Sequence, residues 1–145
     1  MFYWPVRVYY EDTDSGGVVY YANYLRYLER ARTEWLRNLG IEQDVLAKDA
    51  GLIFAVRSLT IDYLRPARFN EQLHVGAAVS ARRAASLDFA QRVVRADSAP
   101  AAARVEDGGD GELCTARVRI VCVDAATLRP RRIPDHLLAE TIREG

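Results

Sequence analysis

An acidic stretch with two glycines, Asp12-Thr-Asp-Ser-Gly-Gly17, precedes a segment with helical periodicity. The first backbone N–H groups of a helix have no partner inside the helix, and the helix dipole adds partial positive charge at that end. A carbonyl bound there would be polarised by the backbone while the carboxylate of Asp14 attacks it or activates a water. We interpret Asp14 as a candidate nucleophile or general base. The backbone N–H of Tyr21, at the expected helix start, is the candidate oxyanion donor.

Residues around these two are candidates for holding a substrate. Gly17 has no side chain, which would let backbone approach a substrate closely, and Val18 follows it directly. The apolar run that Val18 begins predicts that the segment passes inward, where an aspartate is costly unless a site uses it. Asn23, just inside the helix start, either orients substrate or caps the helix. Asp12 is expected to shape the turn.

Two other interpretations of the acidic stretch compete with catalysis. In the first, its Asp, Ser and Gly residues simply form a surface turn, which all three residue types suit. In the second, the stretch is a calcium loop with Asp12 as the first ligand. Gly17 then fits the sixth position, but a glycine also fills the fifth, and Asn23 replaces the glutamate required at the twelfth. The calcium loop is therefore rejected. Because His74 and His136 are isolated, the sequence shows no metal site.

A long helix must position this stretch. Apolar residues recur at steps of three and four, at Tyr24, Leu28, Ala31 and Trp35. This spacing predicts a helix over 22–39 that ends at a glycine, with its charged residues, Arg32 among them, on a solvated face.

The remaining segments predict a mainly β chain around that helix. Strands are expected over 2–10, 52–64, 71–82, 87–96 and 112–124, and further helices over 42–50 and after Pro134. In the last helix we expect Leu137, Leu138 and Ile142 to face inward. The low-complexity connection 97–111 is interpreted as a mobile hairpin loop.

This order of elements indicates an α+β fold with an antiparallel sheet packed on one long helix. A chain of 145 residues, half of them apolar, suits a single domain over 1–145. The edge strands of such a sheet remain to be covered. Pairing edge to edge with a second copy is an economical solution, so we expect an oligomer.

Composition excludes several other classes of protein. The 20 basic and 20 acidic residues cancel, so the one-sided positive charge of a nucleic-acid-binding protein is missing. No apolar run near the N-terminus is long enough for a signal peptide or a membrane span, which predicts a cytoplasmic protein without an integral membrane segment. Cys114 and Cys122 fall on one face of a predicted strand, too far apart to bridge, and are interpreted as core residues.

The run Val8-Tyr-Tyr-Glu-Asp-Thr-Asp-Ser-Gly-Gly-Val-Val-Tyr-Tyr-Ala-Asn-Tyr24, with its continuation to Leu36, carries a closer likeness. It resembles the hotdog-fold acyl-CoA thioesterases of the 4-hydroxybenzoyl-CoA thioesterase family, and most of all the branch associated with the Tol-Pal cell-envelope system. The segments 61–67, 73–75 and 86–92 are similar to family segments too. The resemblance covers essentially the whole chain except 97–111.

The resemblance implies a hotdog fold, in which a five-stranded antiparallel sheet wraps one long central helix. It implies dimers that often pair into tetramers, with active sites at the dimer interface. Asp14 falls on the family's catalytic aspartate, and Tyr21 on the position whose backbone N–H polarises the thioester carbonyl. Members of the Tol-Pal branch usually carry His at this second position. A backbone role survives that change, whereas a contribution from an imidazole does not.

The substrate implied is an acyl thioester of CoA or of acyl carrier protein, with no metal or cofactor, because CoA is part of the substrate. Arginines near the site mouth would suit the CoA phosphates, and Ser86 would help to orient substrate. The candidate arginines are Arg65, Arg68, Arg82 and Arg83.

Two alternative functions compete with thioester hydrolysis. A hotdog-fold dehydratase expects a catalytic His on the long helix, and this helix has none. A protein that binds acyl thioesters without hydrolysing them, or an interaction subunit of an envelope or lipid-synthesis complex, stays open. In that case Tyr21 would mark lost activity.

Overall fold

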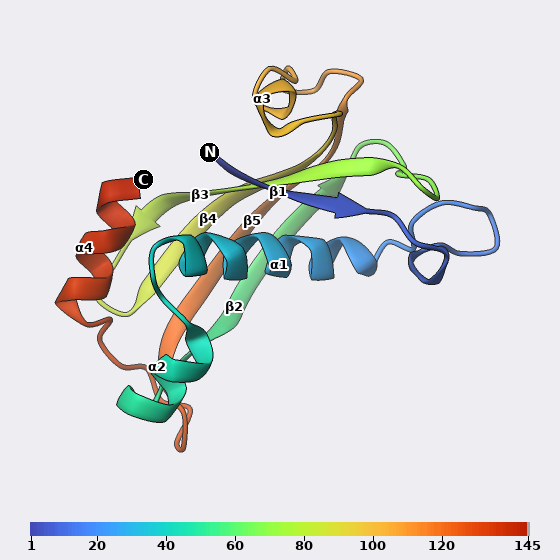
Figure 1. The fold of residues 1–145 in the computed structure, drawn as a ribbon. Helices are drawn as coiled ribbons and strands as arrows, with labels where there is room; N and C mark the ends of the chain where they lie inside the picture. The colour runs from blue at the N-terminus through green and yellow to red at the C-terminus, as the bar shows by residue number, and fades with distance from the viewer. Residues whose placement is uncertain (145) are drawn as a thin grey trace.

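The computed structural model describes residues 1–144 and contains a five-stranded antiparallel sheet with a long helix across one face (Figure 1). Its strands are β1 (Phe2–Arg7), β2 (Leu52–Tyr63), β3 (Gln72–Arg82), β4 (Ser86–Arg95) and β5 (Glu112–Asp124). Its helices are α1 (Asn23–Asn38), α2 (Gln43–Ala50), α3 (Ala99–Ala102) and α4 (Asp135–Glu144), together with the short 3-10 helix η1 (Tyr10–Asp12).

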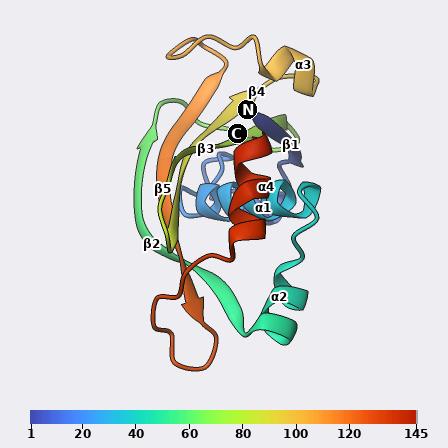
Figure 2. The ribbon, with the colours of Figure 1, turned by 90° about the vertical axis from the view of Figure 1, so that its left-hand side faces the viewer.

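The strands lie in the order β1-β3-β4-β5-β2, so β1 and β2 form the two edges. All four pairings are antiparallel, and a bulge near Arg57 bends β2 along its partner β5. Figure 2 shows the sheet curving around α1. The predicted α+β arrangement of a sheet around one long helix is confirmed.

The core lies between α1 and the concave face of the sheet. The predicted stripe Tyr24, Leu28, Ala31 and Trp35 is buried along its whole length. The ring of Trp35 meets Phe89 of β4 edge-on, with centroids 5.3 Å apart. Aromatic pairs prefer this geometry, so it fixes how the helix sits on the sheet.

Strand β5 shows the predicted alternation. Ala116, Val118 and Ile120 are buried on the helix side, while Arg117 and Arg119 point away from it. Cys114 and Cys122 are both buried free cysteines, which confirms their interpretation as core residues.

Two side chains contradict the sequence-based expectations. Arg32 was placed on a solvated face, yet it is 8% exposed, because the sheet curls far enough around α1 to cover it. Ile142 was expected to face inward, yet it is 60% exposed, and Thr141 beside it is the buried residue. The predicted inward positions of Leu137 and Leu138 hold in part, since both are partly buried against the core.

Two segment boundaries also differ from expectation. The first strand ends at Arg7, because the chain turns into η1 before it reaches the acidic stretch. The connection 97–111 joins β4 to β5 as predicted, but it contains the short helix α3. Carbonyl oxygens of this connection accept hydrogen bonds from the side chains of Arg65 and Arg92, which attach it to the sheet.

None of the helices formed by residues 1–144 combines the length and apolar character that crossing a membrane requires.

Candidate active site

The acidic stretch forms a small closed loop in front of α1. Thr13 and Val19 face each other in an isolated antiparallel bridge, so residues 14–18 form a short loop whose two ends are held together. The backbone N–H of Asp14 donates to the carbonyl of Val18 at 2.9 Å, which closes the loop further. Asp14 is therefore held on a defined backbone, and its side chain is exposed.

The glycines of the loop have separate roles. Gly17 has a φ of +78°, a left-handed conformation that residues with a side chain rarely adopt. At Gly16 an added Cβ would lie 3.2 Å from Oδ1 of Asp14. That oxygen accepts a hydrogen bond of 2.8 Å from the backbone N–H of Gly16. The turn thus engages one carboxylate oxygen of Asp14.

Asp12 joins the loop to the helix. Its carbonyl accepts hydrogen bonds of 2.9 Å from the backbone N–H of Tyr20 and from the side-chain amide of Asn23. Its carboxylate accepts the backbone N–H of Tyr9, also at 2.9 Å. The expectation that Asp12 shapes the turn is confirmed. Asn23, one of the substrate-binding candidates, uses its amide to hold this turn.

The start of α1 carries backbone donors without partners. Ala22 precedes the helix and makes no side-chain capping bond. The N–H of Asn23 donates to the carbonyl of Tyr20 at 2.9 Å, and that of Tyr24 to the carbonyl of Tyr21 at 3.3 Å. Within residues 1–144, the N–H groups of Tyr21 and Ala22 find no acceptor. Two neighbouring free donors at a helix N-terminus suit a developing negative charge on oxygen.

The run from Val18 to Tyr21 was expected to pass inward, and for the single chain this is wrong. Only Val19 is buried; the side chain of Tyr21 is 61% exposed. The physical reason is that η1 and the loop lie beyond the edge of the sheet (Figure 1), where Ala67, Arg68 and Phe69 contact them on one side only.

A hollow of about 260 Å³ lies beside the helix start. Tyr63, at the end of β2, reaches across it, and its hydroxyl donates to the carbonyl of Tyr21 at 3.0 Å. The lining is largely apolar and aromatic, formed by Val19, Tyr21, Tyr24, Tyr63, Leu64, Arg65 and Pro66.

The arginine candidates are spread over the molecule. Arg65 lines the hollow, but its guanidinium donates to the carbonyls of Gly108, Gly109 and Glu112 and so supports the 97–111 connection. Arg68 is the backbone bridge partner of Val18, which places it beside the Asp14 loop.

Arg82, Arg83 and Ser86 lie where β3 turns into β4, at the far end of α1 from the Asp14 loop (Figure 1). Arg82 donates to the hydroxyl and carbonyl of Thr141 in α4, at 3.2 and 2.6 Å. Arg83 forms an ion pair of 3.0 Å with Asp88. Within one chain, these three candidates do not come together with Asp14.

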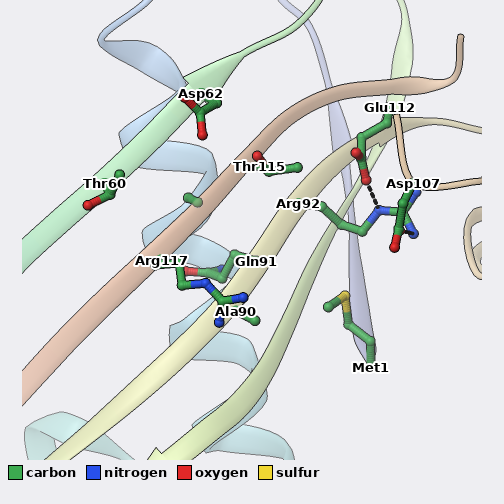
Figure 3. Close-up of a pocket in the computed structure, with 11 residues that line it drawn as sticks. Met1, Thr60, Asp62, Ala90, Gln91, Arg92, Asp107, Glu112, Thr115 and Arg117 are labelled. Carbon is green, nitrogen blue, oxygen red and sulfur yellow. Dashed lines mark ion pairs between the residues drawn. The ribbon is translucent and has the colours of Figure 1, made fainter. Parts of the chain in front are cut away.

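A second hollow, of about 390 Å³, lies on the sheet face that points away from α1 (Figure 3). Arg92 and Glu112 form a nearly buried ion pair of 2.8 Å at its rim. Asp14 and Tyr21 are not among its lining residues. No group of three or more His, Cys, Asp or Glu side chains in residues 1–144 is arranged to hold a metal ion.

A buried polar pair that the sequence does not predict lies under α1. Arg32 donates to the side-chain oxygen of Gln91 in β4 at 3.0 Å. The amide nitrogen of Gln91 donates to the carbonyls of Leu28 and Gly76 at 3.1 and 3.2 Å. Burial lowers the pKa of Arg32 below its ordinary value, although the charge of Glu29 opposes this. In the sequence, the helical period places Arg32 outside the apolar stripe of α1. That position predicts exposure to solvent.

Comparison with known proteins agrees with this architecture. Residues 8–141 match the model of the thioesterase-like superfamily. The acyl-CoA thioester hydrolase YbgC of Escherichia coli O157:H7 is 41% identical over 140 residues, which cover 97% of this chain and 95% of that protein. The crystal structure of a probable thioesterase from Bartonella henselae is 33% identical, with a TM-score of 0.77, covering 91% of this chain and 98% of that one.

A variant of 4-hydroxybenzoyl-CoA thioesterase in complex with 4-hydroxybenzoyl-CoA has a TM-score of 0.81 at 19% identity, covering 96% of each chain, and shows the shared fold. The protein belongs to the thioesterase-like superfamily. It has the hotdog fold and is a thioester hydrolase, as the resemblance of its sequence predicted.

Proposed function

We propose that this protein hydrolyses acyl-CoA thioesters where the Asp14 loop meets the start of α1. The observation that carries the proposal is the pair of partnerless N–H groups at Tyr21 and Ala22, next to a loop that fixes an exposed carboxylate. The names of the relatives support CoA as the leaving group.

In the proposed reaction, the thioester carbonyl oxygen accepts a hydrogen bond from the N–H of Tyr21, with the helix dipole adding to the polarisation. The carboxylate of Asp14 then follows one of two routes. It attacks the carbonyl carbon and expels the CoA thiolate, leaving an anhydride that water hydrolyses. Alternatively, it takes a proton from a water that attacks directly. Both routes yield a free acid and CoA, and neither requires a metal or an organic cofactor.

A second copy of the chain completes the proposed site. Strand β2 is an edge of the sheet with exposed apolar side chains, including Val56 and Leu59, and such an edge suits pairing with an identical strand. The 16 residues of α1 span about 24 Å at 1.5 Å per residue. Arg82, Arg83 and Ser86 lie across that length from Asp14, so we propose that they serve the site of the partner copy.

Finer features of the proposal rest on the sequence resemblance. They are the assembly of dimers into tetramers, the use of acyl carrier protein in place of CoA, the cytoplasmic location and the link to the Tol-Pal system. The side chain of Tyr21, in place of the branch's usual His, bears on acyl preference and leaves the backbone donor intact.

The test is thiol release from short aliphatic, long aliphatic and aromatic acyl-CoAs by the wild type and by Asp14→Asn. Asparagine retains the oxygen that accepts the Gly16 N–H but loses the charge needed for attack or proton transfer. Asp49→Ala, an exposed change on α2, is the control. We expect turnover in the wild type and the control only. Binding of these esters by the wild type without turnover of any of them would instead favour the non-hydrolytic binding role.

Isotope transfer separates the two routes. In a single turnover in water enriched in oxygen-18, label enters the enzyme's carboxylate only if Asp14 has formed the anhydride and water opens it at the aspartyl carbon. Direct attack by water places label in the product acid alone.

A further inference from the structure

Tyr63 links the end of edge strand β2 to the start of α1. Its hydroxyl donates to the carbonyl of Tyr21 at 3.0 Å, joining residues 42 positions apart. Burial raises the pKa of Tyr63 above its ordinary value of 10.0, so the hydroxyl keeps its proton at neutral pH.

The ring of Tyr63 is itself held in place. It meets Tyr24 edge-on, with centroids 5.4 Å apart and planes inclined by 67°. Tyr24 is almost fully buried, and its hydroxyl accepts the backbone N–H of Ala67 at 2.9 Å. A fixed neighbour thus orients Tyr63, and the donor at its tip is aimed at one particular carbonyl.

That carbonyl needs the support. Apart from Tyr63, its other donor within residues 1–144 is the N–H of Tyr24 at 3.3 Å, a long bond, and no side chain caps this end of the helix. The carbonyl of Tyr21 and the N–H of Ala22 belong to one peptide group. A hydrogen bond to the carbonyl polarises that group and strengthens its N–H as a donor. The same bond fixes this peptide plane and therefore the direction of the free N–H of Ala22.

We propose that Tyr63 is a positioning residue for the thioesterase reaction: its hydroxyl holds the Tyr21 carbonyl, and with it the Tyr21–Ala22 peptide plane, so that the free N–H of Ala22 stays directed at the thioester oxygen beside the N–H of Tyr21. The inference rests on the proposed function. Tyr63 acts through the backbone of α1, while its ring forms one wall of the 260 Å³ hollow in which the thioester would lie.

The first test is Tyr63→Phe, which retains the ring and removes only the donor. We expect kcat to fall by about five- to tenfold, the usual scale for one hydrogen bond, with KM within about twofold of the wild type. Tyr10→Phe is the matched control. Tyr10 is exposed, and it contacts Phe69 by ring stacking, in which its hydroxyl takes no part. An unchanged kcat, or a change confined to KM, would overturn the positioning role.

The second test measures the polarisation of the thioester carbonyl directly. It uses the Asp14→Asn protein, which is expected not to hydrolyse the ester. A carbonyl-labelled benzoyl-CoA bound to Asp14→Asn is expected to show a lowered carbonyl stretching frequency by difference Raman spectroscopy. With Tyr63→Phe added, this lowering is expected to shrink. An equal lowering in both proteins would contradict the inference. If the wild type hydrolyses the ester and Tyr63→Phe has the same kcat, only this inference is refuted. If the wild type hydrolyses none of the esters, the proposed function is refuted.

Discussion

The side-chain amide of Asn23 donates to the carbonyl of Asp12 at 2.9 Å, so the first residue of α1 is bound to the acidic stretch that precedes it. The free donors at Tyr21 and Ala22 lie in the segment that this bond closes. Loop and helix start therefore behave as one unit, and the position of Asp14 depends on a residue that need not touch substrate.

Asn23→Ala removes this link. We expect a loss of about 1 kcal/mol in the free energy of unfolding, measured in urea. We also expect a several-fold lower kcat, because the loop is no longer held in place relative to the helix start. Asn38→Ala, an exposed change near the other end of α1, should leave both values unaltered. A stable Asn23→Ala protein with full activity would show that the link does not serve the site.

Gln91→Leu should be strongly destabilising. Gln91 accepts from Arg32 and donates to two backbone carbonyls, so its loss leaves several buried groups without partners. We expect a loss of about 2 to 3 kcal/mol in unfolding free energy. A double-mutant cycle with Arg32→Met should give a coupling energy above about 0.5 kcal/mol. Additive effects of the two substitutions would mean that the interaction between Arg32 and Gln91 does not contribute to the free energy of unfolding.

Val56→Asp should disrupt assembly through the β2 edge, because it places a charge among apolar side chains that a second copy would cover. Sedimentation velocity is expected to show an oligomer for the wild type and a monomer for the variant. Val45→Asp on α2 is a close control, since Val45 is 51% exposed and Val56 is 54% exposed. If both variants sediment as the wild type does, the interface lies elsewhere.

The two cysteines should be inert in the folded protein. Burial raises the pKa of Cys114 from 9.0 to about 12 and also raises that of Cys122, because a thiolate is poorly solvated there. Ellman's reagent at pH 8 should find both thiols only after unfolding. A raised folded-state pKa contributes stability below pH 9.0, and this is lost as the pH rises toward 12. Rapid labelling of the native protein would contradict the burial.

The sequence predicted what depends on local pattern and missed what depends on tertiary approach. The period of α1 and the alternation of β5 placed Trp35 and Val118 correctly, since each follows from its own segment. Arg32 and Gln91 are 59 positions apart, and only the curl of the sheet brings them together. The same holds for Arg82 and Thr141.

At the site, the acidic motif indicated Asp14 and Tyr21 as candidates, whereas the contact of Tyr63 with Tyr21 was not predicted. A tyrosine at the end of a strand carries no motif of its own. Its relation to Tyr21 exists only because the end of β2 lies beside the start of α1. The exposure of Tyr21 was mispredicted for a related reason. An apolar run indicates that its side chains become buried, but it does not reveal whether the same chain or a second copy buries them.

We assign the hydrolysis to the carboxylate of Asp14, and the kcat of Asp14→Asn on the best acyl-CoA found for the wild type tests this assignment. Asparagine preserves the bond to the Gly16 N–H, so the loop is expected to persist, as its circular dichroism and melting temperature would verify. The account predicts a fall of at least about a hundredfold in kcat. A folded Asp14→Asn protein that retains most of the wild-type rate would contradict it.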